Sequence, residues 1–290
     1  MVLELRSDPT KKVVVIIANN RIKRPHHHSY ASCFFCKGNE KMTPKTTFAL
    51  PDEKNWVVRS FRNQFPVVKP SSKKAFGEHE VIVETDVHEK LFQDLGEKEG
   101  ELVFSIYKHR FEALGKRKGI KTVCLIKNHG KDGGASVSHE HAQIISLSVV
   151  PPFIEDEAKK LRKNGKCIFC SLAGEKKWRL AENKSFIAVC PPFARSSYEI
   201  WLICRRHAKS ISELSAEEGR DLMGLLKDCI RRIYPKTESY NLAFHNAPLG
   251  KDFHFHVEIY PRTEKYAGLE LGFSVVVNPR SEKDVLRELK

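Results

Sequence analysis

The sequence predicts an α+β fold made of two similar halves, each an antiparallel sheet with helices packed on one side. First, an ordered set of Cys and His residues occurs twice along the chain, which indicates internal duplication. Second, both halves show the same order of apolar segments: strands, one long helix, a strand, a turn, and a strand that carries His-x-His. An α+β pattern with strands that follow one another along the chain is typical of an antiparallel sheet with helices on one face.

In the first half, short apolar runs rich in β-branched residues predict strands. One longer segment has apolar residues at helical spacing and predicts an amphipathic helix. A glycine-rich turn precedes the last strand. The expected strands are 11–18, 56–61, 80–85, 121–128 and 137–150, the helix is 90–117, and the turn is 129–136.

The second half repeats this order. Its helix has sharp limits, because Ser215 and Glu218 form a capping-box pattern at its start and Pro235 stops it. The expected strands are 185–192, 197–206, 239–248 and 254–262, and the helix lies within 210–235. We therefore predict two domains, 1–150 and 151–290, divided where Pro151-Pro152 ends the preceding strand.

Composition narrows the class of protein. The chain has 290 residues, 41% of them hydrophobic, which is enough for a sizeable core. No apolar run approaches the roughly 18–20 residues that cross a bilayer, and the start lacks the apolar region of a secretory signal. We expect a cytoplasmic protein with no membrane partner. The net charge is +14, but acidic and basic residues are interspersed, which argues against a nucleic-acid-binding stripe.

The repeated set begins with a C-x-x-C pair, Cys33 and Cys36, followed by His88 and His139. Two thiolates on a tight turn with two imidazoles give a Cys2His2 shell, which favours zinc. The equivalent set in the second half is Cys167, Cys170, His207 and His254. We therefore predict two zinc sites.

The second metal site has an alternative shell, which would suit a harder metal such as iron. It consists of Glu157, His245, His254 and His256. A separate run, His26-His27-His28, follows a proline in a polar segment and is interpreted as solvated or as support for the site.

The predicted strand that contains the first His-x-His also holds the candidate catalytic residues. On a strand, residues i and i+2 point to the same face, so His139, His141 and Gln143 share one face. If metal holds His139, it also fixes His141 nearby. An imidazole beside a phosphate can attack phosphorus, and a neighbouring amide can bond the phosphoryl oxygen that gains charge. We therefore predict His141 as nucleophile and Gln143 as its partner.

Several longer motifs carry a resemblance to a known family. They are CFFCKGNEKMTP (33–44), FRNQFP (61–66), KNHGKDGGASVSHEHAQII (127–145), FHNAP (244–248) and the tail 266–289. Together they resemble the galactose-1-phosphate uridylyltransferase family of the histidine-triad superfamily, in a compact form close to the plant ADP-glucose phosphorylases. The resemblance implies two histidine-triad-like halves forming a half-barrel, and a homodimer.

The resemblance also implies residue roles. His141 takes the nucleotidyl group as a covalent phosphoramidate, and Gln143 hydrogen-bonds the phosphoryl oxygens. The implied substrate-binding residues are Asn128 and Ser136 at the phosphates, Phe61 and Asn63 at the nucleoside, Arg21 and Arg24 at phosphates, in some members from the partner subunit, and Glu270 at the sugar. The chain departs from the family at Phe34 and Glu140, where the usual residue is proline.

Three functions follow as hypotheses. The first is ping-pong transfer, in which UDP-glucose and galactose 1-phosphate give glucose 1-phosphate and UDP-galactose. The second uses phosphate as acceptor, as an ADP-sugar or dinucleoside-polyphosphate phosphorylase. The third is a zinc-stabilised nucleic-acid-binding module without turnover, which needs basic residues gathered on one face.

Overall fold

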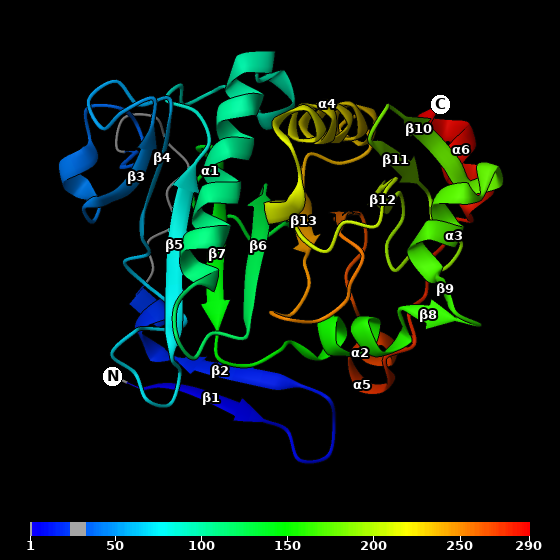
Figure 1. Ribbon diagram of the computed structural model, residues 1–290, viewed down its shortest axis with the longest axis horizontal. Helices are drawn as coiled ribbons and strands as arrows, with labels where there is room; N and C mark the ends of the chain where they lie inside the picture. The colour runs from blue at the N-terminus through cyan, green and yellow to red at the C-terminus, as the bar shows by residue number, and fades with distance from the viewer. Residues whose placement is uncertain (1, 24–32) are drawn as a thin grey trace.

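A computed structural model describes residues 2–23 and 33–290. Its centre is one ten-stranded antiparallel sheet in the order β10-β11-β12-β14-β13-β6-β7-β5-β4-β3 (Figure 1). The first-half strands are β3 (Thr46–Leu50), β4 (Val58–Arg62), β5 (Gly77–Val83), β6 (Thr122–His129) and β7 (His141–Leu147). The second-half strands are β10 (Arg179–Glu182), β11 (Phe186–Val189), β12 (Ile200–Cys204), β13 (Tyr240–His245) and β14 (His256–Pro261).

The strand order reads the same from both edges. From the outer edge inward, the first half runs β3-β4-β5-β7-β6 and the second runs β10-β11-β12-β14-β13. The inner strands β6 and β13 pair antiparallel and join the halves, with Asn128 opposite Asn241. The duplicated α+β architecture expected from the sequence is therefore present, as one continuous sheet.

Two long helices cover one face of this sheet (Figure 1). Helix α1 (Glu97–Gly115) connects β5 to β6, and α4 (Ala216–Ile233) connects β12 to β13. They pack against each other and against strands of both halves. The main apolar core lies between sheet and helices, and it includes Ile144 of β7 and Ile259 of β14.

The helix limits follow local chemistry. Ser215 caps α4, with its side chain accepting from the Glu218 backbone N–H at 3.1 Å while the Glu218 carboxylate accepts from the Ser215 N–H at 2.7 Å. This reciprocal pairing satisfies two backbone donors at the helix start. Helix α1 begins at Glu97, later than expected, because the preceding residues form a separate short turn, η4 (Phe92–Asp94).

Smaller elements complete the molecule. A separate hairpin of β1 (Leu3–Ser7) and β2 (Val14–Ala18) reaches the second half, where Lys12 donates to Asp156 at 2.7 Å. The remaining elements are η1 (Asn19–Lys23), η3 (Glu40–Met42), α2 (Pro152–Lys160), β8 (Arg162–Lys163), β9 (Lys166–Cys167), α3 (Ile168–Gly174), η5 (Lys176–Trp178), η6 (Ile211–Glu213), α5 (Gly268–Phe273) and α6 (Glu282–Leu289). Among the described residues, no helix has the length and apolar character needed to span a membrane.

Candidate active site

The candidate nucleophile begins strand β7, on the sheet face away from the helices. Alternation along the strand places Ala142 and Ile144 in the core beneath the helices and turns His141 and Gln143 to the other face. The His141 Nδ1–H donates to the backbone oxygen of His139 at 2.8 Å. Because a carbonyl oxygen can only accept, Nδ1 carries the ring proton, and Nε2 keeps the lone pair that a nucleophile needs.

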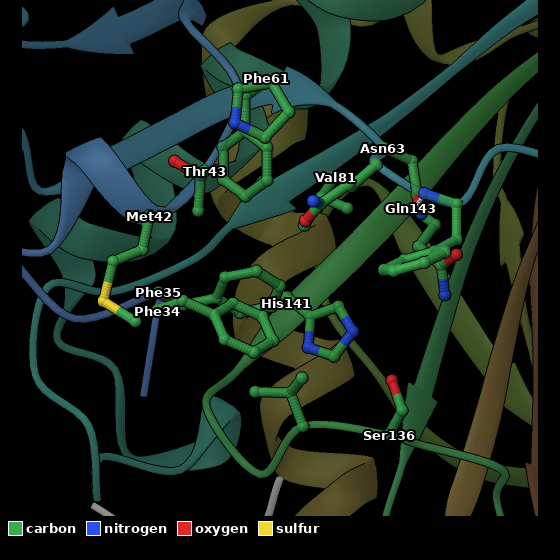
Figure 2. Close-up of a pocket in the computed structure, with 14 residues that line it drawn as sticks. Phe34, Phe35, Met42, Thr43, Phe61, Asn63, Val81, Ser136, His141 and Gln143 are labelled. Carbon is green, nitrogen blue, oxygen red and sulfur yellow. Dashed lines mark hydrogen bonds between the residues drawn. The ribbon is translucent and has the colours of Figure 1, made fainter. Parts of the chain in front are cut away.

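A cavity of about 330 Å³ opens beside this imidazole (Figure 2). Four phenylalanines give it an apolar wall, and the centroid of the Phe35 ring lies 5.2 Å from that of the His141 ring. The lining is Phe34, Phe35, Met42, Thr43, Pro44, Phe61, Asn63, Gln64, Phe65, Val81, Ser136, Val137, His141 and Gln143. Within the described chain, no Asp, Glu, Lys or Arg belongs to this lining. The cavity therefore suits a planar, uncharged group with polar groups at one end.

A second, smaller cavity shares part of this wall. It measures about 220 Å³, and Val137 and His141 line both cavities. Asn128 and Lys131 also line the smaller one, where they offer an amide and an ammonium group. His141 thus stands between an apolar compartment and a polar one.

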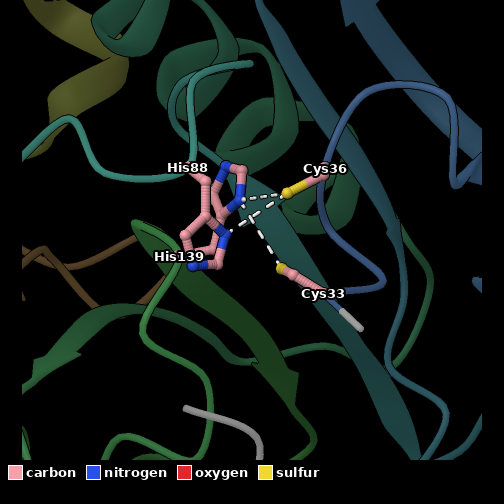
Figure 3. A group of neighbouring side chains, drawn as sticks. All are labelled: Cys33, Cys36, His88 and His139. Atoms are coloured by element: carbon pink, nitrogen blue, oxygen red, sulfur yellow. Dashed lines mark hydrogen bonds between the residues drawn. The ribbon is translucent and has the colours of Figure 1, made fainter. Parts of the chain in front are cut away.

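The four predicted ligands of the first metal site come together (Figure 3). The Cys36 Sγ lies 3.3 Å from His88 Nδ1 and 3.6 Å from His139 Nδ1, and the Cys33 Sγ lies 3.7 Å from His139 Nδ1. A tetrahedral zinc shell needs ligand atoms about 3.3–3.8 Å apart, given the usual Zn–S and Zn–N lengths. The four side chains fit that ion.

The surroundings of this group support the fit. The Nε2–H of His139 donates to the Thr85 carbonyl oxygen at 2.8 Å, which leaves Nδ1 free to ligate. Burial lowers the pKa of His139, so its ring is neutral. Burial and the neighbouring Cys33 raise the pKa of Cys36 to about 12, which disfavours the thiolate. A bound cation would stabilise the thiolate.

The second Cys/His group has the same construction. Both Cys167 Sγ and Cys170 Sγ lie 3.4 Å from His254 Nδ1, and Cys170 Sγ lies 3.7 Å from His207 Nδ1. The His254 Nε2–H donates to the Cys204 carbonyl oxygen at 2.8 Å, as His139 does in the first half. His207 Nε2 lies 3.0 Å from a carboxylate oxygen of Asp252. This group also fits zinc.

The alternative shell does not form as the sequence suggested. His254 belongs to the cysteine group, and its place beside Glu157, His245 and His256 is taken by Glu258. Glu258 lies two residues after His256 on β14, so both side chains lie on the same face.

These four residues make a third potential metal group with harder ligands. Burial opposes protonation of His245, but Glu258 and Glu157 outweigh it and raise its pKa to about 10. The Nε2 atom of His256 is buried without a hydrogen-bond partner. Carboxylates with imidazoles and one unsatisfied ring nitrogen fit a metal such as iron.

The duplication extends to the nucleophile position. His256 Nδ1 donates to the His254 carbonyl oxygen at 2.9 Å, which repeats the His141 arrangement. However, His256 is fully buried beneath Phe169, whose ring stacks on it at 4.1 Å. At the position equivalent to Gln143, the second half has Glu258, whose carboxylate would repel a phosphate. Only the first half presents an imidazole suited to attack.

Glu140 lies on the opposite side of the strand, as alternation predicts. Its buried carboxylate contacts the Lys127 ammonium and lies 2.9 Å from His129 Nδ1. Lys127 also contacts Glu84, so this buried charge group links the segments beside the nucleophile. Glu140 therefore lies outside the large cavity, although it lines the smaller one together with His141.

Most of the predicted substrate-binding residues that the structure describes line one of these two cavities or lie beside it. Phe61, Asn63 and Ser136 line the large cavity, and Asn128 lines the small one. Arg21 lies beside the large cavity, where its guanidinium donates to the Phe65 carbonyl oxygen at 2.9 Å.

Glu270 is not brought to His141 within the chain. It lines a cavity of about 720 Å³ in the second half, and its carboxylate accepts from the Ala267 and Val277 backbone N–H groups. Arg24 and His26, His27 and His28 lie outside the described residues.

Sequence reasoning missed several residues at the site. Phe35 lies inside the C-x-x-C motif, and its position between the cysteines was the available signal. Thr43 and Pro44 belong to the motif 33–44, which gave no sign that both line the cavity. His79 lies behind Gln143, at a Nε2–Oε1 distance of 2.9 Å, and no spacing pattern marked it.

Comparisons with known proteins agree with this geometry. Residues 129–289 match the family model "Galactose-1-phosphate uridyl transferase, C-terminal domain", and residues 17–150 match "Domain of unknown function (DUF4931) N-terminal domain". An ADP-glucose phosphorylase from Arabidopsis thaliana is 28% identical, over 99% of this chain and 92% of its own. A galactose-1-phosphate uridylyltransferase from Thermotoga maritima is 27% identical, over 99% of this chain and 98% of its own.

A solved structure shows the same fold over the whole length. The crystal structure of an ADP-glucose phosphorylase from Arabidopsis thaliana with bound ADP-glucose has a TM-score of 0.85 and 30% identity. It covers 100% of this chain and 98% of that one. By these matches, the chain belongs to the galactose-1-phosphate uridyl transferase family.

Proposed function

We propose that the protein transfers a nucleotidyl group from a nucleotide sugar, through a covalent bond to His141. The observation that carries the proposal is the His141 imidazole, which is held by its Nδ1–H and presents Nε2 at an apolar cavity. Nε2 attacks the α-phosphorus, the bond from phosphorus to the bridging oxygen breaks, and a hexose 1-phosphate leaves. An acceptor phosphate oxygen then attacks the same phosphorus and frees the imidazole.

The substrate fits across the two cavities. The nucleoside lies against Phe35 and Phe61 in the large cavity, and the phosphates lie at His141, near Gln143 and Ser136. The polar cavity with Asn128 and Lys131 accepts the leaving group. The turn between β6 and β7 can bring its backbone close to a phosphate, because it contains two glycines without side chains. Gly134 has φ +76°, and a Cβ at Gly133 would lie 2.1 Å from the His129 backbone oxygen.

The primary acceptor we propose is galactose 1-phosphate, with UDP-glucose as donor. This matches the reaction named for the Thermotoga maritima relative, and a sugar 1-phosphate can occupy the compartment that the leaving group vacates. The enzyme would then be a hexose-1-phosphate uridylyltransferase of the cytoplasm.

One observation favours a second reaction. The relative named ADP-glucose phosphorylase matches this chain over 99% of its length, and its structure holds ADP-glucose. In that reaction the AMP group passes to free phosphate. The apolar cavity walls accept either base by stacking.

The test is the mass of the intact protein after exposure to one donor at a time. UDP-glucose should add one UMP, or ADP-glucose one AMP, and the adduct should be acid-labile and located on His141. Galactose 1-phosphate or inorganic phosphate should then discharge it selectively. A protein that turns over either donor without ever carrying an adduct would contradict the covalent route.

We further propose that the two Cys/His groups hold zinc and that the third group, with Glu258, holds the harder metal. The zinc at Cys33, Cys36, His88 and His139 fixes the strand that carries His141 and does not contact substrate. Metal analysis of the protein as purified tests this assignment, with two zinc ions per chain as the expected content.

We also propose that the protein works as a homodimer in which the partner subunit completes the site. The lining of the large cavity offers no cation for the phosphates among the described residues, and Glu270 lies in another cavity of its own chain. Around Glu270, the side chains of Leu271 and Phe273 are 73% and 77% exposed. Such an apolar surface is typical of an interface.

A further inference from the structure

His79 lies within hydrogen-bond distance of the Gln143 side chain. It lies on β5, which pairs with β7 so that Val81 stands opposite Gln143. His79 is two residues from Val81 on the same face, which makes it the diagonal neighbour of Gln143. Both side chains are buried, with exposed fractions of 3% for His79 and 4% for Gln143.

The proton on the His79 ring can be assigned from a backbone donor. The Val67 backbone N–H donates to His79 Nδ1 at 3.2 Å, so Nδ1 is the acceptor nitrogen. A neutral imidazole carries one proton, which is therefore on Nε2. His79 Nε2 lies 2.9 Å from the Gln143 Oε1 and donates to it.

This bond decides which way the Gln143 amide faces. An amide has one accepting oxygen and one donating nitrogen, and the oxygen is directed to His79. The NH2 group is therefore left for the cavity, where a phosphoryl oxygen gains negative charge. With the opposite orientation, the amide oxygen would face that charge and repel it.

Asn63 is arranged by the same histidine. Its backbone N–H donates to the His79 carbonyl oxygen at 2.8 Å, and its side-chain oxygen accepts from the Phe65 N–H at 2.8 Å. The Asn63 amide nitrogen lies 3.2 Å from His79 Nε2, so Asn63 and Gln143 both approach this ring nitrogen.

We propose that His79 is a positioning residue for nucleotidyl transfer, which aligns the Gln143 amide as a donor to the transferred phosphoryl group. The chain of donors runs from the Val67 N–H to His79 Nδ1, from His79 Nε2–H to Gln143 Oε1, and from the Gln143 NH2 group to the phosphoryl oxygen. This inference rests on the proposed function, because it assumes that the phosphoryl group meets Gln143.

Two substitutions of His79 distinguish the hydrogen bonds made by its two ring nitrogens. In His79→Asn, the amide oxygen can still accept from the Val67 N–H, but the donor to Gln143 is lost. In His79→Gln, the longer side chain can return an N–H donor near the position of Nε2. The rate of His141 labelling by labelled nucleotide sugar, measured in a single turnover, is the readout for each.

We expect His79→Asn to slow labelling by about 10- to 100-fold, since residues that orient a functional group typically contribute that much. The donor concentration for half-maximal rate should change less than about threefold, because the lost bond matters most in the transition state. The final amount of label should stay that of the original protein, which a partly unfolded variant would not achieve. His79→Gln should recover most of the rate.

The Gln143→Ala variant supplies the decisive control. If His79 acts through Gln143, adding His79→Asn to Gln143→Ala should slow labelling by less than about twofold. A full additional loss in the double variant, or an unchanged rate in His79→Asn alone, would overturn the proposal.

A measurement independent of turnover separates this inference from the proposed function. Nitrogen NMR of the histidine rings should show His79 with its proton on Nε2, and His79→Asn should shift the Gln143 side-chain amide signals. A proton on Nδ1 would refute the positioning role. Absence of any label on the original protein would instead refute the covalent function, and with it the catalytic part of this inference.

Discussion

At the scale of the residue, two short-range constraints hold the His141 imidazole. Its Nδ1–H donates to the backbone oxygen two residues before it, and the residue that supplies that oxygen, His139, lies in a potential metal group. His141 is 4% exposed, so most of its imidazole is shielded from bulk solvent. A fixed tautomer with weak hydration is the state in which an imidazole attacks phosphorus most readily.

Replacing this residue should abolish labelling. We expect His141→Asn to lower the rate of nucleotidyl transfer by at least about 10³-fold, as for other removed nucleophiles. The fold should persist, because the side chain ends at a cavity. Single-turnover labelling checks the rate, and circular dichroism checks the fold.

His256→Asn is the matched control. This substitution changes the position in the second half that is equivalent to His141 and is buried beneath Phe169. The variant should still be labelled on His141, although its stability should change. Equal loss of labelling in both variants would contradict the assignment of the nucleophile to the first half.

At the scale of the element, helix α4 shows how local pairs set the limits of a structure. Hydrogen bonding by Arg206 lowers the pKa of Glu218 to about 2 from its ordinary value of 4.5. The carboxylate also accepts from the Ser215 N–H at the helix start. Glu218 therefore stabilises the fold in its charged form. Its negative charge also interacts favourably with the positive, N-terminal end of the α4 dipole.

The sign of the pH effect follows from the lowered pKa. The contribution is fully present above about pH 4.5 and is lost as the pH falls toward 2, because the unfolded chain takes up the proton first. Arg206 is half-exposed, so we expect about 1 kcal/mol or less from this pair. The difference in free energy of unfolding between the original protein and Glu218→Gln should shrink between pH 5 and pH 3, measured by urea titration.

The cap itself gives a separate prediction. Ser215→Ala removes the acceptor for the Glu218 N–H and should lower the free energy of unfolding by about 1 kcal/mol at neutral pH. Urea titration measures this loss. Ser212→Ala is a control outside the helix, and a larger effect there than at Ser215 would contradict the capping role.

At the scale of the whole molecule, the duplicated halves differ in the side chains that they present. Both halves keep the strand order and the Cys/His group, but only the first keeps an accessible imidazole and an amide beside it. The second half supplies the third potential metal group and the exposed apolar surface around α5. The halves share one sheet through β6 and β13, so stabilising one half also supports the other.

Breaking one metal group at a time should separate stability from catalysis. Cys36→Ser and Cys170→Ser should each lower the zinc content from two ions to one per chain. Only Cys36→Ser should also slow the labelling of His141, by about 10- to 100-fold, because His139 lies two residues before His141, the first residue of β7. Metal analysis with single-turnover labelling decides this, and an equal slowing by Cys170→Ser would count against it.

Mixing two variants tests the proposed homodimer. We expect His141→Asn and Glu270→Ala each to turn over poorly alone. After mixing and exchange of subunits, mixed dimers have one site with both residues intact, so turnover should rise to about a quarter of the original. No recovery, despite exchange shown by mass spectrometry, would mean that Glu270 does not act across the interface.

Much of this protein was decided by local sequence. The face shared by His141 and Gln143 and the Ser215 cap follow from local spacing, because strand alternation and helix capping act over a few residues. The two Cys/His groups were predicted from the repeated order of their residues, although members such as Cys33 and His139 lie 106 residues apart. Tertiary structure decided what depends on distant segments. Glu258 replaces His254 in the third group, His79 reaches Gln143 from another strand, and His256 is closed off by Phe169. Those contacts are set by how strands pair and side chains pack, which no local pattern encodes.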